Sequence, residues 1–283
     1  MNGFKRSRQS IGPSGPLAFT TASGTVFFNH LQIIQSGGVM RIAVISDIHG
    51  NATALRQVLK DIESCKADQV ICLGDNIGYG PEPEAVVSML RQMNIASVMG
   101  NHELVINNPG FLGWFNTAAR LSLEKSIDAI SPPNLDFLSR LPDFITAFGC
   151  RFVHGFPPDS PTNYMFEIYP AEMEKIMADM AEPVCFIGHT HDLALITYQD
   201  RSVNQSPLTG SKTVFLDSTL KYIINAGSVG QPRDGTGEAK YVLFDTEAYS
   251  LEVRRIPYDV NDTIKKIHAA GLPRQHALRL SWP

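Results

Sequence analysis

The stretch RIAVISDIHGN, residues 41–51, decides how the chain folds. Its first half is a short apolar run rich in β-branched residues, which predicts a buried strand. Asn51 closes the stretch and is a residue type that caps helix N-termini. Beyond it, apolar side chains recur at helical spacing, at Leu55, Val58, Leu59 and Ile62. The stretch therefore predicts a strand, a tight polar turn and an amphipathic helix.

The same alternation continues outward from this stretch. Residues 69–73 predict a second buried strand, residues 86–93 the apolar face of a second helix, and residues 95–99 a third strand. Strand and helix alternating at this spacing indicate βαβ units and a partly parallel sheet. Later strands, several joined by short loops that favour antiparallel hairpins, are predicted at 151–154, 184–187, 213–216, 222–225, 240–245 and 250–255.

Two segments depart from this pattern. Residues 109–142 are expected to be helical around 114–130, to be closed by the sequence SPP at 131–133, and to cap a sheet edge. Residues 1–39 hold three of the 24 Lys and Arg residues and none of the 28 Asp and Glu residues, so residues 40–283 carry a net charge of −7. We expect residues 1–39 to be a flexible extension and residues 40–283 to form the functional domain.

Composition excludes several classes of protein. With 283 residues, of which 43% are hydrophobic and 18% charged, the chain has enough apolar material for one large α/β domain. Its apolar runs fall far short of the ~20 residues that span a bilayer, so no membrane helix is expected. A net charge of −4 argues against general nucleic-acid binding. The four scattered cysteines predict reduced, buried thiols in a cytoplasmic protein.

Polar side chains gather where the predicted strands end, which is where open α/β sheets bind their ligands. Taken singly, Asp47 has an alternative role as a helix cap, and Asp75 and Asn101 as turn residues. Together they form a set that includes five of the eight histidines. The five strand ends read Asp47-Ile48-His49, Gly74-Asp75, Gly100-Asn101-His102-Glu103, His154-Gly155 and Gly188-His189-Thr190-His191.

This set has the chemistry of a metal centre. It offers carboxylate, amide and imidazole groups but no thiolate, which suits Mn, Fe or Zn. Seven of these side chains are candidate ligands, which is too many for one ion and suits two ions that share a ligand. They are Asp47, His49, Asp75, Asn101, His154, His189 and His191. Two divalent cations, two aspartates and a bridging hydroxide leave a net charge of about +1, which is matched to a phosphate oxyanion.

The five blocks, in this order, resemble the signature blocks of the calcineurin-like metallophosphoesterases over residues 40 to about 260. The segments GYGP at 78–81 and NAGSVGQPRDG at 225–235 are similar to a small prokaryotic subfamily described as similar to diadenosine tetraphosphatases. The resemblance implies an α/β fold, a four-layer αββα sandwich of two mixed β-sheets flanked by helices. It also implies hydrolysis of a small phosphorylated metabolite, such as a dinucleoside polyphosphate, by a metal-bridging hydroxide.

The resemblance also implies roles for individual residues. Mn²⁺ is the expected metal, with Fe or Zn as alternatives. His102 is expected to orient the phosphate or to protonate the leaving alkoxide. Asn51 and Arg233 are candidates for phosphate contact, although Arg233 suits a surface ion pair equally well. One ion is expected on Asp47, His49, Asp75 and His191, and the other on Asp75, Asn101, His154 and His189.

Other interpretations remain open at this stage. Trp114 and Phe115 either stack on a nucleobase or are simply buried by the cap. A general phosphodiesterase is the alternative enzyme. A non-enzymatic scaffold on the same fold is disfavoured because such scaffolds lose metal ligands, and a nuclease is disfavoured by the acidic domain. Residues 76–79 lack the Arg that protein serine/threonine phosphatases and symmetric dinucleoside tetraphosphate hydrolases carry after the Gly-Asp motif. The sequence leaves the oligomeric state open.

Overall fold

The computed structural model describes residues 20–21, 24–25, 40–209 and 213–281. The chain divides into two units, Met1–Ser36 and Gly37–Pro283. In the first unit, β1 (Thr20–Thr21) pairs antiparallel with β2 (Gly24–Thr25). The remainder of the expected N-terminal extension lies outside the described residues.

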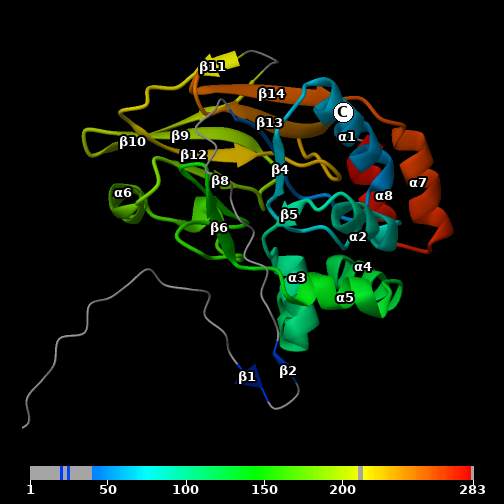
Figure 1. Cartoon of the computed structure of the whole chain (residues 1–283). Coiled ribbons are helices and arrows are strands. Elements are labelled where there is room, and N and C mark those ends of the chain that lie inside the picture. The colour runs from blue at the N-terminus through cyan, green and yellow to red at the C-terminus, as the bar shows by residue number, and fades with distance from the viewer. Residues whose placement is uncertain (1–19, 22–23, 26–39, 210–212, 282–283) are drawn as a thin grey trace, which may run out of the picture. The chain divides into compact units, whose positions relative to one another are not determined.

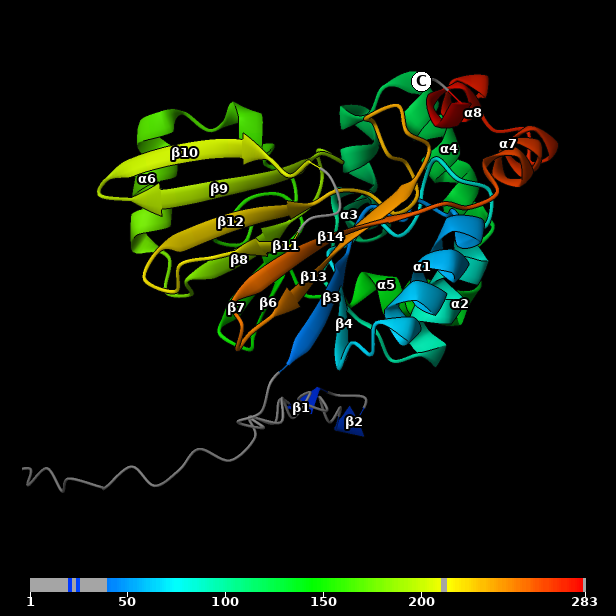
Figure 2. The ribbon, with the colours of Figure 1, turned by 90° about the horizontal axis from the view of Figure 1, so that it is seen from above.

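The second unit is built on two six-stranded mixed sheets (Figures 1 and 2). In the first sheet the strand order is β11-β14-β13-β3-β4-β5. Strands β3, β4 and β5 are parallel, as the βαβ pattern predicts, and β13, β14 and β11 add antiparallel pairs. The strands span Arg41–Ile45 (β3), Gln69–Cys72 (β4), Ala96–Ser97 (β5), Thr213–Phe215 (β11), Ala239–Asp245 (β13) and Ser250–Ile256 (β14).

The second sheet has the order β10-β9-β12-β8-β7-β6. Its centre, β12-β8-β7, is parallel, and its edges are antiparallel hairpins. Sequence reasoning missed β6, β9 and β10. The strands span Phe144–Ala147 (β6), Cys150–Val153 (β7), Val184–Ile187 (β8), Leu193–Gln199 (β9), Ser202–Pro207 (β10) and Lys221–Ala226 (β12).

Strand β3 shows why the sheets stack. Successive side chains point to opposite faces of a strand. Ile42 and Val44 enter the core between the two sheets, where they join Phe186 of β8. Ala43 and Ile45 face the other way and pack in the cluster that holds the helix α1. A strand that is covered on both faces requires an unbroken apolar run, which is the pattern of residues 41–45.

Helices complete a four-layer αββα arrangement, as expected. Helices α1 (Ala52–Ser64) and α2 (Pro83–Gln92) cover the first sheet, and α6 (Pro170–Asp179) covers the second (Figure 2). Near the C-terminus, α7 (Val260–Ala269) packs against α1 and α8 (Arg274–Ser281). Sequence reasoning missed α6, α7 and α8.

Residues 101–139 form a helical layer beside β5 (Figure 1). It comprises α3 (Asn101–Asn107), a 3₁₀ helix η1 (Pro109–Trp114), α4 (Thr117–Asp128) and α5 (Pro132–Ser139). The helix expected over 114–130 begins later, because the Asn116 side chain accepts hydrogen bonds from the backbone N–H groups of Ala118 and Ala119. The two prolines open α5, where the first helical turn tolerates them.

Other differences from the expected elements are small. Strand β5 is shorter than 95–99, because the chain leaves the sheet after Ser97 and the Met99 N–H donates to the carbonyl of Pro142. All four cysteines are free, three buried and Cys65 half-buried. Within the described residues, no helix combines the length and the apolar character that a membrane span requires. A short 3₁₀ helix, η2 (Met165–Glu167), lies in the loop before α6.

Candidate metal centre

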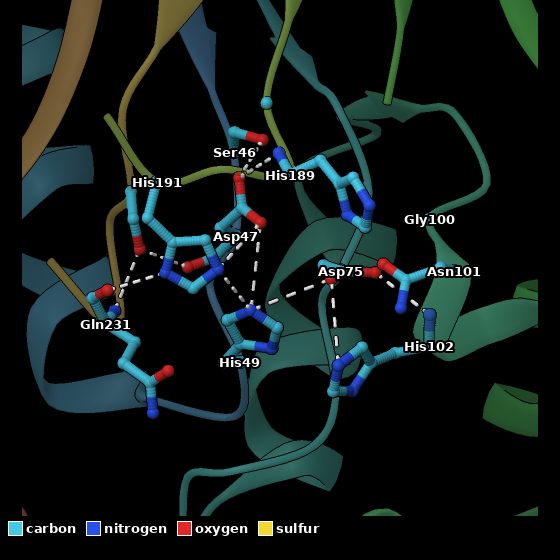
Figure 3. Close-up of polar contacts among 12 residues, drawn as sticks. Ser46, Asp47, His49, Asp75, Gly100, Asn101, His102, His189, His191 and Gln231 are labelled. Carbon is cyan, nitrogen blue, oxygen red and sulfur yellow. Dashed lines mark hydrogen bonds and ion pairs between the residues drawn. The ribbon is translucent and has the colours of Figure 1, made fainter. Parts of the chain in front are cut away.

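The polar strand ends of both sheets meet at one place in the second unit (Figure 3). Strands β3 and β4 bring Asp47, His49 and Asp75, and Asn101 begins α3. Strands β7 and β8 of the other sheet bring the remaining three histidines predicted as ligands. Six of the seven side chains are buried, with exposed fractions of 4% or less, and Asn101 is half-buried. The structure thus brings together all seven residues predicted from the sequence.

The backbone is unusual at these strand ends. A positive φ is uncommon for residues other than glycine and persists where the surroundings impose it. Here the surroundings are hydrogen bonds between loops: the Asp47 N–H donates to the Gly74 carbonyl and the His49 N–H to the Asp75 carbonyl. Five of the predicted ligands have φ between 47° and 68°, namely Asp47, His49, Asp75, His189 and His191.

A first group of ligand atoms converges around Asp47. His191 Nε2 lies 3.2 Å from Asp47 Oδ1 and 3.2 Å from His49 Nε2. Among the described residues, no donor forms a hydrogen bond with Asp47 Oδ1, although the atom is fully buried. A buried carboxylate oxygen without a hydrogen bond is costly unless a cation satisfies it. The donor set of the first group therefore fits a metal ion.

A second group converges around His154. Its Nε2 lies 3.4 Å from Asp75 Oδ2, 3.1 Å from His189 Nδ1 and 3.1 Å from Asn101 Oδ1. Rotating the Asn101 amide would let its nitrogen donate to these acceptors. A cation between them would satisfy all four groups with the amide oxygen in place. Asp75 Oδ2 also lies 3.7 Å from His49 Nε2, which makes Asp75 the link between the two groups.

The opposite ring nitrogen of each predicted ligand histidine donates to a backbone carbonyl. Such bonds fix the tautomer and the direction of the ring and leave the other nitrogen free to bind a metal. Because a carbonyl only accepts, the nitrogen facing it must carry the hydrogen. The pairs are His49 Nδ1 to Ile77 O (3.0 Å), His154 Nδ1 to Leu73 O (2.7 Å), His191 Nδ1 to Gln231 O (2.6 Å) and His189 Nε2 to Thr162 O (3.2 Å).

The buried carboxylates of the cluster create a negative potential that favours positive charge beside them. Burial opposes ionisation of Asp75, but the surrounding histidines hold its pKa well below the ordinary value. Burial likewise lowers the pKa of His154, yet the nearby carboxylates, Asp75 foremost, outweigh it and raise that pKa to about 9. Burial lowers the pKa of His189 to about 3 and lowers that of His191 as well. The negative potential that suits a divalent cation therefore centres on Asp75 and His154.

His102 borders the cluster from the first turn of α3. Its backbone N–H donates to Asp75 Oδ1 at 3.0 Å, and its Nε2 lies 3.8 Å from Asp75 Oδ2. Within the described part of the chain, Nδ1 has no hydrogen-bond partner. A side chain at Gly78 would overlap the imidazole, so the absence of a Cβ there makes room for His102. Burial lowers the pKa of His102 to about 3.

Comparison with known proteins identifies the family. The model of the calcineurin-like phosphoesterase superfamily domain matches residues 40–249. The chain belongs to this superfamily. An uncharacterised protein of Methanocaldococcus jannaschii is 33% identical over 249 residues, which cover 84% of this chain and 96% of that protein. The family carries phosphoesterase activity, and the chain is accordingly a phosphoesterase.

Solved structures agree with this assignment. The crystal structure of a metallophosphoesterase from Sphaerobacter thermophilus aligns with a TM-score of 0.74 at 33% identity, covering 87% of this chain and 99% of that one. A hypothetical protein from Pyrococcus horikoshii OT3 aligns with a TM-score of 0.69 at 17% identity, over 86% and 98% of the two chains. The second likeness shows the shared fold.

Glu103 is a structural member of the phosphoesterase site whose role the sequence did not indicate. Its buried carboxylate accepts three backbone N–H groups, from Asp75 at 2.9 Å, Asn76 at 2.8 Å and Gly100 at 2.9 Å. These bonds tie the end of β4 to the start of α3. Glu103 therefore fixes the spacing between Asp75 and Asn101.

The loop after β12 positions Arg233 at the mouth of the phosphoesterase site. Lys240 is fully buried, and its ammonium donates to Asp234 Oδ1, to Thr236 Oγ1 and to the Glu238 carbonyl. These bonds close the loop on itself. Arg233 is exposed, with Nη2 3.4 Å from His191 Nε2, a position that suits an incoming phosphate.

Asn51 is occupied by structural contacts. Its Oδ1 caps α1 by accepting from the Ala54 N–H and also accepts from the Thr263 hydroxyl. Its Nδ2 donates to the Gly230 carbonyl at 3.0 Å. Substrate contact by Asn51 stays a prediction.

Aromatic side chains to which the sequence analysis assigned no role line the phosphoesterase site. Tyr79 packs between His49 and His102, with ring centroids 4.4 Å and 4.8 Å away, and also contacts His276 of α8 at 4.9 Å. Tyr164 stacks on His189 at 3.7 Å. Tyr164 and His276 stand outside the strand-end motifs, so no local pattern in the sequence pointed to them.

Proposed function

We propose that this phosphoesterase hydrolyses a small phosphorylated metabolite with two divalent metal ions, Mn²⁺ first among them. The observation that carries the proposal is the pair of ligand groups that share Asp75, with the opposite nitrogen of every ligand histidine engaged by a carbonyl. One ion is assigned to Asp47, His49, Asp75 and His191, and the other to Asp75, Asn101, His154 and His189.

Two ions at these positions would lower the pKa of bound water and offset the charge of the phosphate. The chain's own residues complete the site. Arg233 carries a guanidinium whose planar fork pairs with phosphate oxygens. His102 holds a buried imidazole beside Asp75, and its Nδ1 has no hydrogen-bond partner among the described residues. The negative charge of a bound phosphate raises the pKa of His102, which equips the ring to protonate the leaving alkoxide.

The proposal extends to the class of substrate and to the cellular location of the protein. A cavity beside the metal centre is lined on one side by Trp114, Phe115 and Asn116 of the segment 109–142, which we assign as a cap on the site. A dinucleoside polyphosphate is a candidate because it presents both phosphates and planar bases. The four free cysteines fit a reducing, cytoplasmic setting.

The test is hydrolysis by chelator-treated protein with and without Mn²⁺, together with the metal content of the protein. The panel contains an aryl phosphomonoester, an aryl phosphodiester and diadenosine tetraphosphate. We expect two Mn²⁺ per chain and turnover that returns with the metal. Asp75→Asn should lose more than the ~10–100-fold that outer-shell changes cost, while Asp179→Asn, exposed on α6, should behave as the parent protein.

Each outcome of this test has a consequence. Faster turnover of the aryl diester than of the other two substrates would favour a general phosphodiesterase. Two bound ions without turnover of any substrate would contradict the proposed substrate class. Absence of Mn²⁺ binding would contradict the metal centre itself.

A further inference from the structure

An aromatic cavity of about 110 Å³ lies against the second ligand group. It adjoins the cavity that contains Asp75, His102 and Arg233, and both are bordered by Asn101, Trp114 and His189. A single ligand can therefore extend from the metal centre into the aromatic cavity. The residues that line the aromatic cavity are Asn101, Phe111, Trp114, Phe115, Thr162, Tyr164 and His189.

One wall of the aromatic cavity comes from η1 and the residue after it. Trp114 is 73% exposed, which is unusual for so large an apolar side chain. Phe111 meets its indole edge-on, with ring centroids 4.7 Å apart at 77°. Phe115 lies between the two sites, since its ring also contacts the imidazole of His102 at 4.9 Å. An exposed aromatic beside a catalytic cavity indicates a binding surface rather than a core position.

The opposite wall comes from the loop between β7 and α6. Tyr164 stacks on His189 with ring centroids 3.7 Å apart at 21°. The same imidazole donates from Nε2 to the Thr162 carbonyl at 3.2 Å. This wall is therefore held at a fixed place relative to the second ligand group.

We propose that the aromatic cavity binds the nucleobase of a nucleotide substrate whose phosphate lies at the metal centre, an inference that rests on the proposed function. A nucleobase is planar and presents π-faces to aromatic side chains, and each stacked base contributes ~1–3 kcal/mol. Arg233 supplies positive charge for the phosphate at the other end. The aromatic lining gives a base a surface that a bare sugar phosphate does not use.

The test uses Trp114 as its own reporter. The chain has two tryptophans, Trp114 and Trp282, so Trp282→Phe leaves Trp114 as the sole tryptophan. The Mn²⁺-loaded protein is titrated with AMP and with ribose 5-phosphate, which carry the same phosphomonoester but differ in the base. We expect AMP to quench the fluorescence of Trp114 and to bind ~10-fold or more tightly than ribose 5-phosphate. Equal affinities would overturn the proposal.

Variants place the effect at the cavity walls. Trp114→Ala and Tyr164→Ala, measured by calorimetry, should reduce AMP affinity to that of ribose 5-phosphate while two Mn²⁺ remain bound. Tyr169→Ala removes an aromatic ring that is 76% exposed and outside the cavity, and it should leave AMP affinity unchanged. AMP affinity that survives both cavity variants would place the base elsewhere and refute the assignment.

This binding assay separates the nucleobase site from the proposed function. Trp114-dependent AMP binding without metal-dependent hydrolysis would support the cavity and refute the phosphoesterase substrate class. Metal-dependent hydrolysis with no preference for a base would support the proposed function and refute the nucleobase site.

Discussion

Asp75 illustrates how much one residue does in this site. Its Oδ2 faces His49, His102 and His154 at 3.7, 3.8 and 3.4 Å, and its Oδ1 accepts the backbone N–H of His102. Its own N–H is held by Glu103. These contacts come from α3 and from the loops after β3 and β7, and they hold the side chain pointing toward both ligand groups.

At this scale we predict the effect of removing the His102 imidazole. His102→Ala should slow hydrolysis of alkyl phosphates, which have poor leaving groups, ~10²-fold or more, and activated aryl phosphates far less. The reason is that only a basic leaving oxygen needs a proton. The measurement is kcat for a series of phosphate esters plotted against leaving-group pKa. Equal losses across the series would rule out His102 as the acid.

At the scale of elements, the loops at the strand ends hold the candidate ligand residues in place. The strand-end loops of the first sheet are joined by backbone hydrogen bonds and by Glu103. On the second sheet, Asn225 of β12 donates to the Gly188 carbonyl and to Thr190 Oγ1, which fixes the loop that carries His189 and His191. Asn225, a residue of the motif at 225–235 to which the sequence analysis assigned no role, therefore holds the neighbouring loop.

A prediction at the scale of elements concerns the attachment of α1 to the first sheet. Arg254 of β14 donates to both carboxylate oxygens of Asp61, at 3.0 and 2.7 Å, and Tyr241 donates at 2.7 Å. Burial opposes ionisation of Asp61, but these hydrogen bonds outweigh it and lower its pKa. Asp61→Asn should therefore reduce the free energy of unfolding by about 1–2 kcal/mol at pH 7.

The stability that Asp61 contributes should depend on pH in one direction. A depressed pKa stabilises the folded state above the unfolded pKa of ~3.9, and that stability is lost as the pH falls through the folded value. Urea unfolding should show a constant difference between Asp61→Asn and the parent from pH 7 to 5, and a smaller one below pH ~4. Asp136→Asn, which removes an exposed ion pair between Asp136 of α5 and Arg140 just beyond that helix, should cost ~0.5 kcal/mol or less. An increase in the difference at low pH would contradict this account.

At the scale of the molecule, the candidate metal centre lies between the two sheets. Asp47 and His49 follow β3 of the first sheet, whereas His154, His189 and His191 follow β7 and β8 of the second. Each ligand group contains residues from both sheets, since His191 lies beside Asp47 and His154 lies beside Asp75. An ion bound here connects the sheets directly and should bind only the folded chain.

Metal binding should therefore stabilise the whole domain. At 100 times Kd, a ligand specific to the folded state adds about 2.7 kcal/mol, which corresponds to a rise in Tm of roughly 5–10 °C for a domain of this size. Thermal unfolding of chelator-treated protein with and without Mn²⁺ measures it. Asp75→Asn should lose the rise and Asp179→Asn should keep it. An unchanged Tm in the parent at saturating Mn²⁺ would show that no such ion is bound.

The sequence by itself determined the features that depend on neighbouring residues. The apolar run at 41–45, the helical spacing after Asn51 and the polar residues at strand ends are local patterns. They were sufficient to predict the βαβ half and the seven side chains that the structure brings together, whereas the sandwich class came from the resemblance of the motifs to a known family. Strands and amphipathic helices can be recognised this way because burial of one face imposes a period on the chain.

Only the tertiary structure decided what depends on distant segments. Tyr164 and His276 reach the site from a loop and from α8 that no motif marks, and Asn51 proved to be occupied by Gly230 and Thr263. The aromatic cavity likewise exists only where η1 and the loop before α6 approach each other. Contacts of this kind are set by how the layers pack, and packing between segments far apart in the chain leaves no periodic trace in the sequence.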